Sequence, residues 1–119
     1  MRALTLTQPW CGLVASGIKL VENRPRPMIK RENVGQVFAI HASREIDESI
    51  SHRIFQLAPE LPGRTPAEQG CRWHLLSRVT SAVIAVATLH DALGIGGGNE
   101  EAIRRAVERA GLAEDQVRW

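Results

Sequence analysis

The sequence predicts a single α+β domain, on three observations. The chain has 119 residues, 44% of them hydrophobic and 24% charged, which is the size and composition of one ordinary globular domain. Hydrophobic residues recur at helical spacing in some stretches and at strand spacing in others. The predicted strands are separated by irregular lengths, which favours α+β over a doubly wound parallel sheet. We therefore expect residues 1–119 to form one domain.

The first half of the chain is predicted to contain three strands and one helix. A short strand is expected at residues 5–7 and a helix at about 9–16, which begins with a proline and which Gly17 can end. Residues 18–24 are rich in extended formers, so a strand is predicted there, ended by the prolines that follow. A more buried strand is predicted over 36–42.

From residue 44 onward the chain is predicted to contain two helices and one strand. A helix over about 44–57 follows from Ser43 as its N-cap and from isoleucines at every fourth position. Residues 58–70 have the proline and glycine content of an exposed loop. The run of β-branched and small apolar residues over 79–89 indicates a central strand. A glycine-rich break then precedes an amphipathic helix that ends near Gly111.

Basic charge gathers in one stretch of the chain. The net charge is only +2, but residues 19–44 carry six basic and two acidic side chains. Thirteen of the fifteen basic residues are arginine, whose planar fork suits phosphate and base contacts. A nucleic-acid partner is one interpretation of this local charge. A solvated face with a composition-driven arginine bias is the other.

Several classes are excluded. No apolar run approaches the roughly 20 residues that span a bilayer, and the N-terminus lacks a signal-peptide core, so we predict a cytoplasmic protein without a membrane partner. Cys11 and Cys71 are too few for a disulfide framework. Cys71 and His74 have the spacing of half a zinc site without a matching second half, so neither a metal nor a cofactor is predicted. The glycines at 96–98 lack the lysine of a phosphate-binding loop.

Three polar motifs stand in order along the first 44 residues. They are Gln8-Pro9-Trp10 at a helix start, Gly17-Ile18-Lys19-Leu20-Val21-Glu22-Asn23-Arg24, and Ile40-His41-Ala42-Ser43 at the end of a strand. Together they resemble the pattern of the ASCH domain family, over about residues 4–44, with the strand at 79–89 in a compatible place. The combination of the three motifs is specific, whereas any one of them alone is weak.

The resemblance implies a PUA-like small β-barrel with flanking helices and a cleft that binds RNA or a nucleotide. Some relatives remove an acetyl group from a modified cytidine, and others are associated with RNA cleavage. In the amidohydrolase branch the motif lysine acts beside a threonine three residues later. Lys19 matches that lysine, but Glu22 stands at the threonine position, and no later glutamate matches the family's distal one. This departure counts against that mechanism.

Lys19 and Glu22 are the candidate catalytic residues. A lysine can hold a phosphate or carbonyl oxygen while a carboxylate moves a proton. In a regular strand, however, residues three apart point to opposite faces, so the two would meet only across a bulge. The alternative is an ion pair that closes the cleft and orients Arg24.

The candidate nucleic-acid-binding residues surround this pair. Their aromatic member can stack on a base or pack in the core, and the basic members can contact phosphates or form a solvated face. They are Trp10, Arg24, Arg26, Lys30, Arg31, His41, Ser43 and Arg44. The predicted function is RNA or nucleotide binding in a basic cleft, with two alternatives: a hydrolase acting on a modified nucleoside or on RNA, and a structural or partner-binding module.

The family resemblance also implies about two further strands after the last helix, which close the barrel. The sequence ends at Trp119 before such strands. The chain is then either truncated or left with an open sheet whose edge a neighbour covers, and a homodimer through that edge is the expected partner arrangement.

Overall fold

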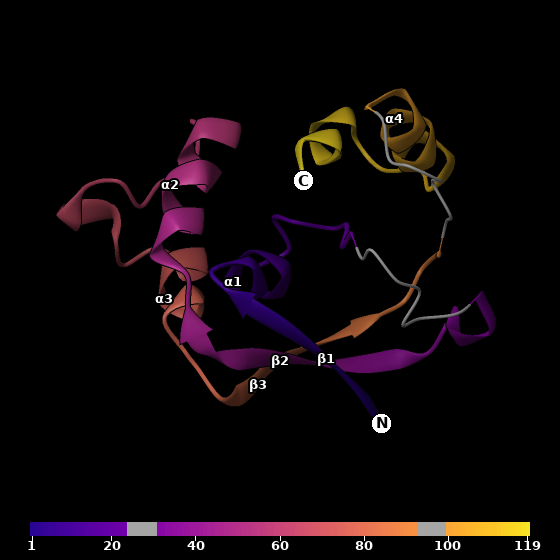
Figure 1. Ribbon diagram of the computed structural model, residues 1–119, viewed down its shortest axis with the longest axis horizontal. Coiled ribbons are helices and arrows are strands. Elements are labelled where there is room, and N and C mark those ends of the chain that lie inside the picture. Colours follow the sequence, from indigo (N-terminus) through magenta and orange to yellow (C-terminus); the bar gives the residue numbers. More distant parts are fainter. Residues whose placement is uncertain (24–30, 93–99) are drawn as a thin grey trace.

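The computed structural model describes residues 1–23, 31–92 and 100–119, and the fold is α+β (Figure 1). Strands β1 (Arg2–Gln8), β2 (Val37–Ile46) and β3 (Ala82–Thr88) form a mixed sheet in the order β1-β2-β3. β1 runs parallel to β2, and β3 runs antiparallel to it. Among the described residues this three-stranded sheet is open, so the closed PUA-like barrel stays a prediction.

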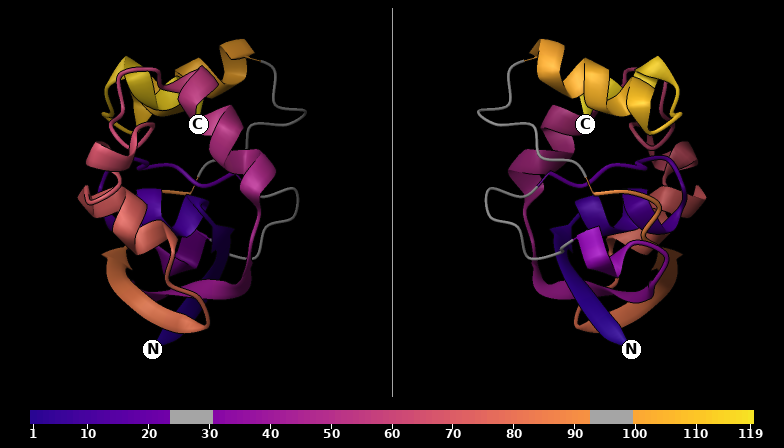
Figure 2. Two further views of the ribbon diagram at one scale, coloured as in Figure 1. Left: turned by 90° about the vertical axis from the view of Figure 1, so that its left-hand side faces the viewer. Right: turned by 90° about the vertical axis from the view of Figure 1, so that its right-hand side faces the viewer.

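The helices lie on one side of this sheet (Figure 2). They are α1 (Trp10–Ala15), α2 (Glu48–Leu57), α3 (Arg72–Ser77) and α4 (Glu100–Arg109), with short 3-10 turns η1 (Arg31–Asn33), η2 (Pro66–Glu68) and η3 (Glu114–Arg118). α1 packs directly over the sheet, and α2 and α3 lie together at one end (Figure 1). None of the described helices is long and apolar enough to cross a membrane.

Two hydrophobic clusters meet at α1. In the first, Cys11 of α1 packs with Leu6, Ile40 and Ala42 from the inner face of the sheet. In the second, Leu13, two residues further along α1, packs with Ile54 of α2 and Trp73 of α3. This short helix therefore joins the sheet to the α2–α3 pair.

Gln8 fixes the start of α1 against α3. Its side chain is fully buried, its Nε2 donates to the carbonyls of Leu76 (2.8 Å) and Val79 (2.7 Å), and its Oε1 accepts from the Gly12 amide (3.0 Å). Because an N-terminal helix amide lacks a partner within its own helix, this last bond serves as a cap from inside the core. The glutamine of the Gln-Pro-Trp motif therefore has a structural role.

The sequence predictions for α1, β2 and α4 are confirmed, with boundaries shifted by a few residues. The helix predicted from residue 44 begins at Glu48, because β2 continues to Ile46 and Asp47 supplies the N-cap by accepting from the Ser49 amide at 3.0 Å. Ser43 is therefore a strand residue and no cap. Helix α3 was missed, since its six residues are too few for a periodic pattern.

Two strand predictions are wrong in part. Residues 18–23 are not a strand; Arg24 lies outside the described residues. Their backbone groups bond elsewhere: the amides of Ile18 and Lys19 both donate to the Leu13 carbonyl at 3.1 Å. The strand at 79–89 exists as β3, but it lies at a sheet edge and is not central. Val83 and Val86 on this strand are 57% and 63% exposed. The β-branched composition therefore predicted a strand correctly but did not predict how deeply it is buried.

Candidate functional site

Lys19 and Glu22 come together beside α1. Lys19 is 5% exposed, and its ammonium Nζ lies 3.0 Å from Glu22 Oε2. The same ammonium also donates to the Val21 carbonyl. An ammonium has three N–H donors, so one of them has no hydrogen-bond acceptor within the described residues. The pair presents a cation, a carboxylate and a spare donor in one place.

The convergence follows from the irregular backbone of residues 17–23. Gly17 has a φ of +80°, which reverses the chain after α1, and no ladder imposes the two-residue alternation of a strand. In a regular strand, side chains three residues apart point to opposite faces, which would keep Lys19 and Glu22 apart. Residues 18–23 do not form a strand, so this constraint does not apply.

The C-terminal turn η3 holds this segment in place. Gln116, which is buried, accepts from the Leu20 amide at 2.8 Å and donates to the Ile18 carbonyl at 3.1 Å. Asn23 Nδ2 donates to the Trp119 carbonyl at 2.9 Å. Side chain and backbone groups almost one hundred residues away thus supply the partners that a neighbouring strand would otherwise give. The sequence motifs hold no local signal for these contacts.

Trp10 lies between the pair and the C-terminal turn. Its half-buried indole meets the Trp119 indole edge-on, with 6.1 Å between centroids, and Lys19 Nζ lies 5.8 Å from its ring centroid. These contacts give Trp10 a packing role and bring a cation–π contact to the buried ammonium. The packing interpretation of Trp10 is therefore the one that the contacts support directly.

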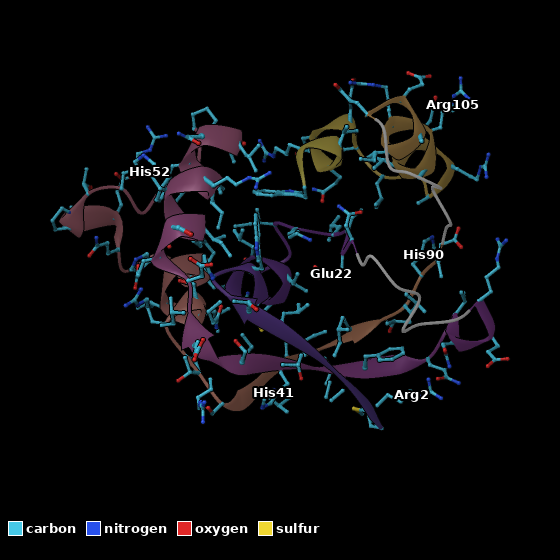
Figure 3. The ribbon with its side chains drawn as sticks, in the orientation of Figure 1. Arg2, Glu22, His41, His52, His90 and Arg105 are labelled. Carbon is cyan, nitrogen blue, oxygen red and sulfur yellow. The ribbon has the colours of Figure 1, made fainter. Side chains whose placement is uncertain are left out.

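The Cys11 thiol is an unforeseen neighbour of the pair. Burial, and after it the negative charge of Glu22, raise the pKa of Cys11 to about 11. The thiol therefore stays protonated at neutral pH, and a thiolate nucleophile is not available at this position. Figure 3 shows Glu22 on the α1 side of the sheet.

His41 and Ser43 lie on the face of the sheet opposite to α1. Along β2 they alternate with the buried Ile40 and Ala42, and His41 Nδ1 lies 3.4 Å from Thr5 Oγ1 on β1. Figure 3 shows His41 and Glu22 on opposite sides of the sheet. Ser43 Oγ donates to the Glu45 carbonyl. These residues do not share one cleft with Lys19.

The basic residues are also dispersed. Arg44 is exposed near the end of β2. Arg31 is exposed on η1, with its guanidinium 3.9 Å from the carboxylate of Asp91. Arg24, Arg26 and Lys30 lie outside the described residues. Of the ten predicted site residues, the structure brings Trp10, Lys19 and Glu22 together.

Comparisons with known proteins do not assign the chain to a family. No model of a known protein family matches the chain, and a search of curated proteins finds no significant match. The ASCH resemblance is therefore carried by the three motifs. Within the described ranges, no three His, Cys, Asp or Glu side chains gather in a metal-binding group.

Proposed function

We propose that the chain is an ASCH-like domain that binds RNA or a nucleotide-like ligand at the Lys19–Glu22–Trp10 cluster. The observation that carries this proposal is the pairing of a buried ammonium and a carboxylate by two residues of one motif. Such a pair is a weak source of folding stability, because the cost of removing the charges from water offsets their attraction. Ligand binding by the charges of Lys19 and Glu22 explains their presence better than a contribution to stability does.

The chemistry of the cluster suits a polar, oxygen-rich ligand. The spare N–H of Lys19 can donate to a phosphate or carbonyl oxygen, and the Glu22 carboxylate can accept from an exocyclic amine or a hydroxyl. Glu22 has 28% of its side chain exposed, whereas Lys19 is buried, so a ligand approaches from the Glu22 side.

A direct binding measurement tests the proposal. Calorimetric titration with RNA oligonucleotides, cytidine and acetylated cytidine should show saturable binding to the wild-type protein. Replacing Lys19 by methionine keeps the length of the side chain, removes its donors and should weaken binding about tenfold or more. Arg105→Gln is the control, because Arg105 is 71% exposed on α4. Absence of any saturable ligand, or equal losses in the two variants, would contradict the proposal.

Hydrolysis is the second candidate function, and one distance favours it. With Nζ and Oε2 only 3.0 Å apart, Lys19 can hold a developing negative charge while Glu22 accepts a proton nearby. Glu22 stands where the amidohydrolase branch has its threonine nucleophile, so the reaction would need water as the nucleophile. We expect binding without turnover, and the variant that separates the two functions is described in the Discussion.

A further inference from the structure

A second polar site lies between α2 and α3, away from the residues that the sequence motifs indicate. The space between these helices and residues 63–69 forms an open groove of about 830 Å³. This volume is within the range of ligand sites in proteins. In Figure 3, His52 lies on the side of α2 that faces away from Glu22. The groove is therefore separate from the cluster around Lys19.

The groove is lined by an arginine that two contacts hold in place. Arg64 Nη2 donates to the Phe55 carbonyl at 2.7 Å, and its guanidinium carbon lies 5.2 Å from the centroid of the Phe55 ring. These two contacts hold the guanidinium in place and leave most of its N–H donors for a ligand. Within the described part of the chain, no carboxylate forms an ion pair with it.

Histidines from both helices line the groove. His52 comes from α2 and His74 from α3. His74 Nδ1 is shielded from solvent and has no hydrogen-bond partner, which is uncommon for a buried ring nitrogen. Arg78 pairs with Glu48 at 2.9 Å, and Glu48 is the only carboxylate among the described residues that line the groove. This pairing leaves Arg64 as the lining guanidinium without an ion-pair partner in the described part of the chain.

The aromatic residues of the groove do not offer a ring face for a planar ligand. Trp73 is 3% exposed, and its indole N–H donates to the Pro62 carbonyl at 2.8 Å. Arg64 already covers a face of the Phe55 ring, which also meets Trp73 edge-on at 5.7 Å. Gly63 is buried against the Trp73 ring with a φ of +121°, so a side chain at this position would be strained. The available groups are the Arg64 guanidinium and polar side chains that form hydrogen bonds.

We propose that the α2–α3 groove is a phosphate-binding site in which the Arg64 guanidinium contacts the oxyanion and the imidazoles of His52 and His74 lie beside it. A guanidinium fork matches two phosphate oxygens, and such charge-assisted bonds are the strong ones. The phosphate is either inorganic or part of a nucleotide, and the room around it admits an attached nucleoside. The proposal does not rest on ligand binding at Lys19.

Imidazole NMR signals of the wild-type protein test this site without any substitution. At constant ionic strength, the ring signals of His52 and His74 should shift saturably when phosphate or cytidine monophosphate is added, whereas cytidine and acetate should leave them unchanged. A response to inorganic phosphate identifies the free ion as a ligand, and a response to the monophosphate alone identifies a nucleotide phosphate; both support the site. No saturable shift, or an equal response to acetate, would overturn it.

Two variants locate the site and separate it from the proposed function. Arg64→Gln should weaken phosphate binding about tenfold or more, because it removes a charge-assisted pair of bonds. Arg53→Gln, on α2 and outside the groove lining, should change it less than threefold. Lys19→Met should leave phosphate binding in the groove intact even when it abolishes binding at the Lys19 cluster. Equal losses in Arg64→Gln and Arg53→Gln would refute the assignment.

Discussion

The ammonium of Lys19 and the carboxylate of Glu22 lie 3.0 Å apart because the chain between them is not a strand. Gly17 turns the chain after α1, and Gln116 satisfies backbone groups of Ile18 and Leu20 that a neighbouring strand would otherwise bind. The pair therefore depends on a contact between residues 18–20 and the C-terminal turn η3. Its chemistry is open to direct tests.

The first prediction separates binding from catalysis at this pair. Glu22→Gln keeps the size of the side chain and removes its ability to accept a proton. If the site is catalytic, turnover of acetylated cytidine or RNA should fall about a hundredfold or more, while ligand affinity changes little. We expect no wild-type turnover above a blank in a chromatographic product assay. Wild-type turnover that both Glu22→Gln and Lys19→Met abolish would show an enzyme.

The second prediction concerns the buried amide of Gln8. Gln8→Leu keeps the approximate volume but leaves the Gly12 amide and the Val79 carbonyl without the partners that Gln8 gives them. Each unpaired buried group costs about 1 to 3 kcal/mol, so the free energy of unfolding should fall by about 2 to 4 kcal/mol in urea titrations. Gln56→Leu, on an exposed position of α2, should change it by about 0.5 kcal/mol at most. A Gln8 variant as stable as this control would contradict the proposed anchoring role.

The third prediction concerns the contact of α1 with α3. A Cβ on Gly12 would lie 2.6 Å from the Ser77 amide nitrogen and 2.8 Å from the Trp73 carbonyl oxygen, both backbone atoms. Gly12→Ala should therefore push α3 away from α1 and lower the free energy of unfolding by about 1 to 3 kcal/mol. Gly70→Ala is the matched control, because no atom lies within 4 Å of its added Cβ. Thermal unfolding of both variants decides the matter: similar midpoints would show that the helices are not in close contact.

The fourth prediction is a pH dependence. The pKa of Cys11 rises from 9.0 to about 11 in the folded chain, mainly through burial. Between these values the unfolded chain has lost the thiol proton and the folded chain still holds it, so stability falls as pH rises from 9 to 11. The slope from this group approaches about 1.4 kcal/mol per pH unit.

A comparison of slopes checks this prediction. Urea unfolding of wild type and Cys11→Ala at several pH values between 8 and 11 should give a flatter dependence in the variant, whatever its absolute stability. Thiolate absorbance of a Cys71→Ser protein should rise with a midpoint near pH 11. A midpoint near 9 would mean that the thiol is accessible to water.

Local sequence was enough to predict α1, α4 and the strands β1, β2 and β3, because these follow from periodicity and composition within a few neighbouring residues, although it also predicted a strand over 18–24 that residues 18–23 do not form. It also indicated Lys19 and Glu22 as partners of one motif. Their convergence could not be predicted, because it depends on whether residues 18–23 pair in a sheet. That depends in turn on Gln116, almost one hundred residues later in the chain.

The arrangement of the remaining candidates was likewise decided by tertiary structure. Alternation along β2 shows that His41 and Ser43 share a face, but only packing of α1 on Leu6, Ile40 and Ala42 shows which face is buried. The edge position of β3 and the α2–α3 groove arise from elements that meet in space without a local signature. Short-range patterns thus indicated candidate polar residues and most of the regular segments. Long-range contacts decided which of those residues meet, because burial and hydrogen-bond partners are properties of the packed chain.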